Sequence, residues 1–200
     1  MTRPIFRSFV IAALLGLAAC SGTLDAWDEN TPARLTAPVH MTQRQIDADP
    51  FLLTSYERVR QEGGEATIYI EGDGPADFLA NEPLKGHTAT PSNPVALHLA
   101  SHDLSPNVIW IARPCQYTGA IYRGHECKSE FWTTKRYSPE TIKAMDTALN
   151  EVKARYGLKG FHLVGYGGGG AIAALLTAQR DDIIDLRTVA GVLNTDLMTR

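Results

Sequence analysis

Five glycines within six residues mark the junction between an apolar run typical of a strand and an apolar run typical of a helix. The first run ends at Gly165, and residues 167–170 are all glycine and open the second run. Glycine adopts backbone conformations that strain other residues, and it allows a helix to pass close to the strand before it. The sequence therefore predicts a sharp strand-to-helix turn at 165–169, a connection that favours an α/β fold.

The rest of the chain supports this fold class. The expected strands cover 42–47, 51–59, 66–70, 107–112, 161–165 and 188–193. A helix is expected to begin after Ser138, an N-cap residue followed by proline, and to stop at Gly157. Because the later strands are almost entirely apolar, we expect a mostly parallel sheet with helices on both faces.

The first twenty residues have the pattern of an export signal. Arg3 and Arg7 precede an apolar run, 9–19, that is too short to span a bilayer. The run ends in Cys20 in a context that resembles the lipobox of bacterial lipoproteins, where the cysteine is acylated. We therefore expect 1–19 to be a signal peptide and Cys20 to anchor the chain in a membrane. Ser21 favours the outer membrane, facing the periplasm. A secretory signal with an incidental cysteine is the alternative.

The remainder divides into a tether and one domain. Residues 20–38 are polar and contain proline, which is typical of a linker, and residues 39–200 are long enough for a single packed domain. The net charge of −3 gives no basic field, so no nucleic-acid partner is expected.

Two cysteines remain inside the predicted domain. In an oxidising compartment, Cys115 and Cys127 are expected to form a disulfide, with two unrelated buried thiols as the alternative. No pair of histidines has the spacing typical of a metal site. We therefore expect no metal and no other cofactor.

The glycine turn also has the spacing of the motif G-x-S-x-G. In that motif a nucleophilic serine stands on the strained turn between a buried strand and a helix. Here Gly165 and Gly169 match the two glycines, and Gly167 stands at the position of the serine. The replacement preserves the turn and removes only the reactive hydroxyl.

With two further segments, this turn resembles the α/β-hydrolase family, and more narrowly its exported bacterial lipoproteins. The segments are 68–74, which includes Glu71-Gly72-Asp73-Gly74, and 112–117, together with Cys127, Trp132 and Thr133. The resemblance implies a scaffold for hydrolysing an ester or amide, with a small acyl compound as substrate. It also implies an oxyanion hole made by the loop Gly72, Asp73 and Gly74 and by the amide of Gly168.

The same resemblance implies a serine, an acid and a histidine, in that order along the chain. Gly167 lacks the hydroxyl, and no histidine follows it before Arg200. Asp196, after the last expected strand, is the candidate acid, with a turn residue as the alternative. We therefore expect a partial hydrolase domain, with its C-terminal part missing, that is inactive or nearly so.

Other polar residues have structural interpretations. His162 is expected to be a hydrogen-bonded core residue beside the turn, and His102 a residue of a solvated loop. Arg113 is expected to pair with Glu71 or Asp73, or to orient a ligand that carries a carboxylate. The histidines expected in loops near the cleft are His87 and His125.

Two functions of other classes remain open. The first is a non-catalytic lipoprotein that binds a ligand or a partner through the same cleft. The second is a dinucleotide-binding domain, because residues 165–170 satisfy G-x-G-x-x-G and Asp196 follows the next expected strand. That fingerprint normally follows the first strand of its domain, whereas here several strands precede it.

Overall fold

The computed structural model describes residues 31–74, 89–117, 121–122 and 125–194. The predicted signal peptide, Cys20, His87 and Asp196 lie outside these described residues. No helix in the described part is long and apolar enough to cross a membrane.

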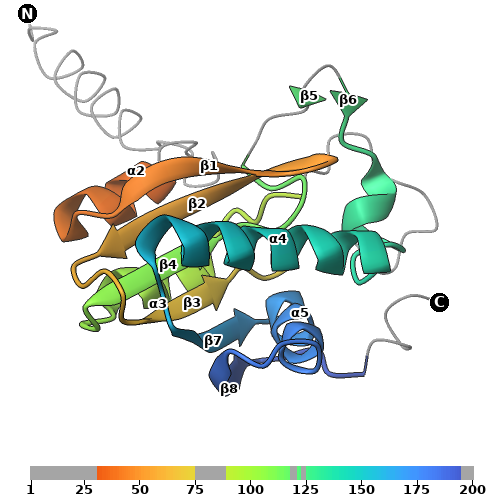
Figure 1. The fold of residues 1–200 in the computed structure, drawn as a ribbon. Helices are drawn as coiled ribbons and strands as arrows, with labels where there is room; N and C mark the ends of the chain where they lie inside the picture. The colour runs from red at the N-terminus through yellow and green to blue at the C-terminus, as the bar shows by residue number, and fades with distance from the viewer. Residues whose placement is uncertain (1–30, 75–88, 118–120, 123–124, 195–200) are drawn as a thin grey trace, which may run out of the picture.

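Six strands form one sheet in the order β1-β2-β4-β3-β7-β8 (Figure 1). The strands are β1 (Thr42–Ala48), β2 (Phe51–Val59), β3 (Glu65–Ile70), β4 (Asn107–Ile111), β7 (Gly160–Tyr166) and β8 (Ile183–Val189). β2 runs antiparallel to β1 and β4, whereas β4, β3, β7 and β8 run parallel. Two short strands, β5 (Ile121–Tyr122) and β6 (His125–Glu126), pair separately. The predicted mostly parallel sheet is confirmed.

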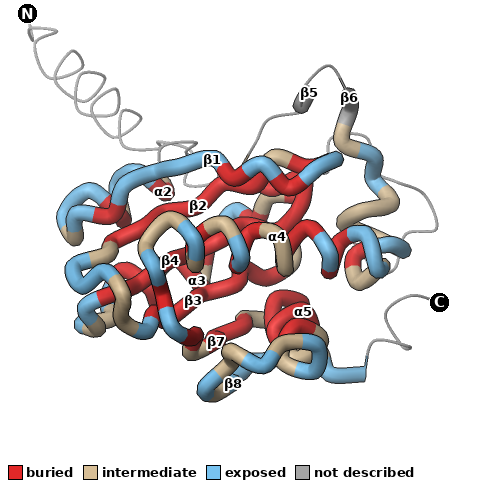
Figure 2. The backbone as a smooth tube through the Cα atoms, viewed as in Figure 1, coloured by how far each residue is buried: buried red, intermediate tan, exposed pale blue. Residues whose placement is uncertain are grey.

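Helices cover both faces of the sheet. On one face α4 (Pro139–Tyr156) and α5 (Gly168–Thr177) contribute to a core cluster with the strands. On the other face α3 (Val95–His102) packs on the central strands, and α2 (Thr31–Thr36) packs on α3. Two single turns of 3-10 helix are η2 (Ala37–Val39) and η3 (Ser129–Trp132). The central strands are therefore buried between two layers, as Figure 2 shows.

The predicted limits of α4 are confirmed. The Ser138 hydroxyl accepts a hydrogen bond from the amide of Thr141 at 3.3 Å, and Gly157 ends the helix in the left-handed conformation with φ 62°. The glycine turn is also confirmed, and α5 begins directly after it at Gly168 and ends at Thr177. The helix α2 lies within the segment 20–38 that the sequence favours as a tether.

The expected last strand, 188–193, was wrong in its bounds. The strand is β8, Ile183–Val189, and the chain then bends at Ala190, where φ is 50°. This bend brings the Val192 amide to the Gly167 carbonyl at 3.1 Å. The polar residues Asp185 and Arg187 interrupt the apolar pattern of β8, because an edge strand is only partly buried.

The two edges of the sheet differ in chemistry. β1 exposes polar and charged side chains, including Gln43, Arg44 and Gln45. β8 exposes a mixture, since Ile184 is 50% and Val189 is 41% accessible and the Arg187 side chain is 65% accessible. A charged edge discourages pairing with another strand, and an apolar edge does not.

Candidate functional site

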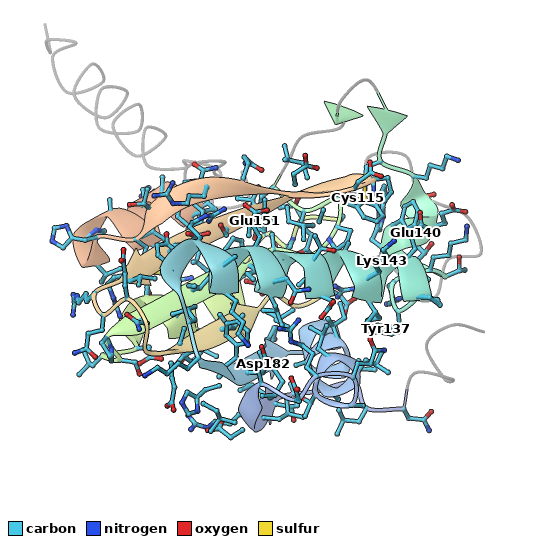
Figure 3. The ribbon with its side chains drawn as sticks, viewed as in Figure 1. Cys115, Tyr137, Glu140, Lys143, Glu151 and Asp182 are labelled. Carbon is cyan, nitrogen blue, oxygen red and sulfur yellow. A yellow bond between two sulfur atoms is a disulfide. The ribbon has the colours of Figure 1, made fainter. Side chains whose placement is uncertain are left out.

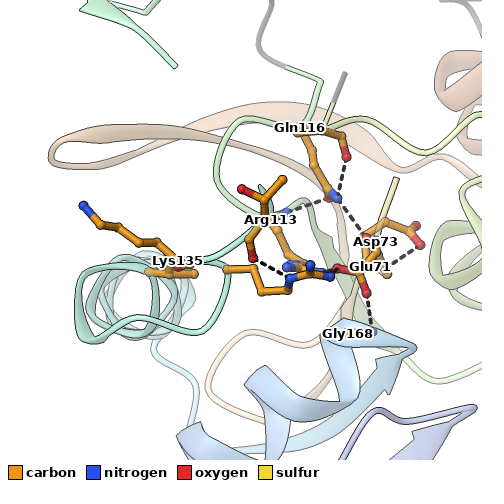
Figure 4. A network of polar contacts seen from close by, with 11 residues as sticks. Glu71, Asp73, Arg113, Gln116, Lys135 and Gly168 are labelled. Carbon is orange, nitrogen blue, oxygen red and sulfur yellow. Dashed lines mark hydrogen bonds and ion pairs between the residues drawn. The ribbon is translucent and has the colours of Figure 1, made fainter. Parts of the chain in front are cut away.

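The candidate site lies where the parallel strands β3, β4 and β7 end. The carboxyl ends of parallel strands meet at one edge, where ligands bind in open α/β sheets. Here the segments 71–74, 112–117 and 167–168 come together, and polar contacts connect them (Figure 4).

Gly167 forms the turn itself. Its φ of 52° and ψ of −122° lie outside the regions that other residues adopt readily. Its amide donates to the Val189 carbonyl at 2.9 Å, which fixes the turn against β8. Among the described residues, a Cβ atom at this position would meet the Cα of Gly72 at 3.9 Å. The turn therefore has room for a side chain that points toward the loop after β3.

Asp73 lies against this turn. Its Oδ2 accepts a hydrogen bond from the Gly168 amide at 3.0 Å, and its Oδ1 accepts one from Arg113 Nη1 at 2.7 Å. Arg136 Nη1 is 3.5 Å from the same Oδ1. Of the two carboxylates expected to pair with Arg113, Asp73 is the one that does so, and Glu71 does not.

The Asp73 carboxylate is held in its charged form. Burial alone would raise the pKa of Asp73, but the Arg113 guanidinium, with Arg136 and the Gly168 amide, lowers that pKa below its usual value. A negative charge therefore stays at the Gly168 amide across the neutral pH range.

Glu71 is completely buried, and it contacts the first turn of α3. It accepts hydrogen bonds from the amides of Gly72 at 2.9 Å and of Ala96 and Leu97 at 3.3 Å, and from Trp110 Nε1 at 2.9 Å. Burial raises the pKa of Glu71, and the four hydrogen bonds oppose this effect. Since α3 follows a proline without a side-chain cap, Glu71 supplies the cap for its first turn.

These contacts bear on the predicted oxyanion hole. Of the expected donors Gly72, Asp73, Gly74 and Gly168, the amides of Gly72 and Gly168 donate to carboxylates of the chain. A substrate oxyanion at Gly168 would have to replace the Asp73 carboxylate. The oxyanion hole itself stays a prediction.

The loop after β4 is locked by Gln116 and by a disulfide. Gln116 Nε2 donates to the carbonyls of Gly72 at 2.8 Å and Ala89 at 3.0 Å, and its Oε1 accepts from the Arg113 amide at 3.0 Å. A disulfide joins Cys115 to Cys127. Figure 3 places Cys115 at the end of the molecule where α4 begins. The loop that carries Arg113 is therefore tied to the segment that leads to α4.

Arg136 belongs to the site, although the sequence did not single it out. It precedes the Ser138 cap by two residues, and its Nε donates to the Thr133 carbonyl at 2.6 Å. The guanidinium groups of Arg113 and Arg136 lie 5.8 and 5.9 Å from the centre of the Tyr137 ring. The only sequence signal was its position just before a strong helix start.

The segment Ser101-His102-Asp103 does not form a triad. His102 Nδ1 is 2.8 Å from the His98 carbonyl, whereas Asp103 accepts a hydrogen bond from the Tyr69 hydroxyl at 3.0 Å. His102 is exposed, but the expected loop was wrong, because His102 is the last residue of α3. The helix was missed because its cap lies far away in the sequence.

His162 lies near the start of β7, at the opposite end of the strand from the glycine turn. Its Nδ1 is 2.5 Å from Asp185 Oδ2, and its Nε2 is 3.2 Å from Glu65 Oε2. The Asp185 carboxylate, followed by Glu65, raises the pKa of His162 above 6.5, although burial opposes this effect. The side chain has a structural role between three strands.

This pKa shift predicts a pH dependence of stability. Because the folded-state pKa lies above the unfolded value, the ion pair contributes its full stability below about pH 6.5, and the contribution is lost as the pH rises through the raised pKa. Removing it with His162→Gln should cost at most about 1 kcal/mol at pH 6, since the pair is partly exposed. Urea unfolding midpoints from pH 5.5 to 9 should converge for the two proteins at high pH. A gap that widens with pH would contradict the assignment.

Among the described residues, no three histidine, cysteine, aspartate or glutamate side chains gather in a way that would hold a metal ion.

Comparisons with known proteins show the fold. No protein-family model matches the chain, and no curated protein does either. A solved protein of unknown function from Agrobacterium tumefaciens, described provisionally as an alpha/beta hydrolase, is 15% identical with a TM-score of 0.53. The match covers 77% of this chain and 62% of that one. The Pyrococcus furiosus esterase Pf2001 is 13% identical with a TM-score of 0.51, over 83% of this chain and 55% of the esterase.

The chain thus spans less than two thirds of the length of each of these two proteins. At these identities the comparisons show the α/β-hydrolase fold alone.

Proposed function

We propose that this chain is an α/β-hydrolase-fold protein that does not hydrolyse esters or amides and binds a small ligand at the glycine turn. The observation that carries the proposal is Gly167, at the position of the nucleophile. Acyl transfer on this fold requires a hydroxyl at the turn and a base that takes its proton. Glycine supplies no group that could attack a carbonyl carbon.

The contact between Asp73 and Gly168 supports the same proposal. In a serine hydrolase the amide after the nucleophile stabilises negative charge that develops on the substrate oxygen. Here the charged Asp73 carboxylate already accepts a hydrogen bond from that amide, which belongs to Gly168. A second negative charge at the same place would be repelled, so the site disfavours a tetrahedral intermediate even if a nucleophile were present.

The experiment compares ester hydrolysis by three proteins. The wild type and Gly167→Ala should both hydrolyse a short-chain p-nitrophenyl ester at the rate of buffer alone. Gly167→Ser should stay near background as well, because no hydrogen bond among the described residues places a histidine at the turn and Asp73 accepts a hydrogen bond from the Gly168 amide. The double variant Gly167→Ser with Asp73→Ala should exceed Gly167→Ser by about tenfold or more, because a single oxyanion-hole donor is worth about a hundredfold or more in rate.

Two results would overturn the proposal. One is hydrolysis by the wild type above the rate of Gly167→Ala. The other is strong hydrolysis by Gly167→Ser alone, which would mean that a histidine of this chain serves as the base.

For its location we propose an outer-membrane lipoprotein that faces the periplasm and is anchored through Cys20. The support is the positive and apolar run before Cys20 and the serine after it. A fatty-acid analogue fed to expressing bacteria should label the wild type and leave Cys20→Ala unlabelled. Equal labelling of the two proteins would contradict the anchor.

A further inference from the structure

We propose that the outer edge of β8 is a dimerisation surface, and that its partner is a second copy of this chain. The two copies pair β8 with β8 in antiparallel orientation, with Leu186 opposite Leu186 at a two-fold axis. The six-stranded sheet then continues from one molecule into the other. The inference concerns assembly, and it stands whether or not the glycine turn binds a ligand.

β8 forms one edge of the sheet. In the described part of the chain it pairs with β7 and with no other strand, and Figure 1 draws it at the lower margin of the molecule. The Val189 carbonyl accepts a hydrogen bond from the Gly167 amide, so it points toward β7. Because the backbone groups of successive residues in a strand point to alternate sides, those of Leu186 and Thr188 point outward, where a further strand can pair with them.

The side chains of this edge divide between the two faces of the sheet. Leu186 lies beside Leu163 of β7, whose side chain belongs to the core cluster that α5 covers. Asp185 and Arg187 lie on the opposite face, where Arg187 Nη2 is 3.3 Å from Asp185 Oδ2. The Arg187 side chain is 65% exposed and that of Asp185 is 36% exposed. The edge therefore presents an apolar residue on one face and two opposite charges on the other.

These charges select one register. In an antiparallel pair, residues whose backbone groups point outward meet each other, so a two-fold axis near the middle of β8 lies at Asp185, Leu186 or Arg187. An axis at Asp185 sets two carboxylates opposite each other, and an axis at Arg187 sets two guanidinium groups opposite each other. Like charges directly opposite are destabilising. An axis at Leu186 instead sets Asp185 of each copy opposite Arg187 of the other, so β8 is complementary to itself in this register.

The same register covers apolar side chains. Leu186, which is 37% exposed, meets Leu186 of the second copy, and Ile184, which is 50% exposed, lies opposite Thr188. Burial of this surface favours association. A single pair of short strands is a small interface, so the dimer is expected to be weak and to depend on concentration. Because β1 exposes polar and charged residues instead, assembly should stop at the dimer.

The test is sedimentation equilibrium of the full chain over a range of concentrations at pH 7. The wild type should follow an equilibrium between monomer and dimer. Arg187→Glu sets two carboxylates opposite each other, and Asp185→Arg sets two guanidinium groups opposite each other. Because each substitution acts at two symmetry-related places, each variant should dimerise at least about tenfold more weakly than the wild type.

An equimolar mixture of the two variants is the matched control. When a copy of Arg187→Glu faces a copy of Asp185→Arg, both cross-strand pairs again join opposite charges. The mixture should therefore dimerise at least about tenfold more tightly than either variant alone. A substitution that only disturbed the fold of its own copy would not be rescued by mixing.

Cysteine crosslinking measures the register, and it decides the question even where a charge variant fails to fold. Leu186→Cys places two thiols at the axis, where opposite Cα atoms lie about 5.5 Å apart, within reach of a disulfide. Thr188 lies opposite Ile184, so Thr188→Cys places its two thiols about 13 Å apart along the strands. Mild oxidation should crosslink Leu186→Cys and leave Thr188→Cys at the level of the wild type, which shares Cys20 with both variants.

Four results would overturn the proposal. The wild type could stay monomeric at its highest soluble concentration, or its assemblies could grow beyond the dimer. Arg187→Glu could dimerise as tightly as the wild type without any gain on mixing. Thr188→Cys could crosslink as fast as Leu186→Cys.

Discussion

Gly169→Ala is expected to destabilise the fold by about 3 kcal/mol or more, at the upper end of the cost of overpacking a core. A Cβ atom on Gly169 would overlap the carbonyl oxygens of Ile70 and Glu71. Both belong to the backbone at the end of β3, in the centre of the sheet, so no flexible side chain can move aside. Urea unfolding followed by circular dichroism measures the loss.

Gly167→Ala is the matched control in the same turn. Among the described residues its Cβ atom would contact only the Cα of Gly72, so the expected cost is the backbone strain of a positive φ, about 1–2 kcal/mol. If Gly169→Ala were as stable as Gly167→Ala, α5 would not pass as close to β3 as described.

Glu71→Ala is expected to cost about 3–5 kcal/mol. The substitution leaves four buried donors without their acceptor, and each unsatisfied buried donor costs about 1–3 kcal/mol where water cannot reach it. It also removes the cap of α3, worth about 1 kcal/mol. The structure relaxes and water enters the space left by the side chain, so the loss of stability is smaller than the sum of these separate costs.

Hydrogen exchange locates the effect. The amides of Ala96 and Leu97 should exchange faster in Glu71→Ala than in the wild type, relative to the amides of α4. Glu71→Gln is the milder comparison, because its one amide oxygen still accepts from part of the donor set. Wild-type stability of Glu71→Ala would mean that α3 does not depend on this carboxylate.

The parts of the fold that the sequence predicts are those whose signals are local. α4 carries its cap, its first-turn proline and its final glycine within one stretch, so Ser138 and Gly157 could be assigned directly. The glycine turn is likewise encoded by neighbouring residues. α3 could not be found in this way, because its N-terminus is capped by Glu71, which is 25 residues before Ala96.

The candidate site was predictable in its position and not in its contacts. Glycine spacing places Gly167 and Gly168 at the end of β7, but spacing does not tell which group accepts the Gly168 amide. Asp73 fills that role only because β3 and β7 are neighbours in the sheet. Arg136 reaches the same carboxylate from a segment with no motif of its own, so its contribution depends on tertiary structure alone.

The two edge strands of the sheet differ in how readily a further strand could pair with them. Along β1, charged side chains guard the free backbone groups, so another strand that approached there would have to desolvate them. Along β8, the accessible side chains of Ile184, Leu186 and Val189 gain by being covered. A strand beside β8 would therefore bury more apolar surface than one beside β1, although it would also have to accommodate the exposed Arg187 side chain.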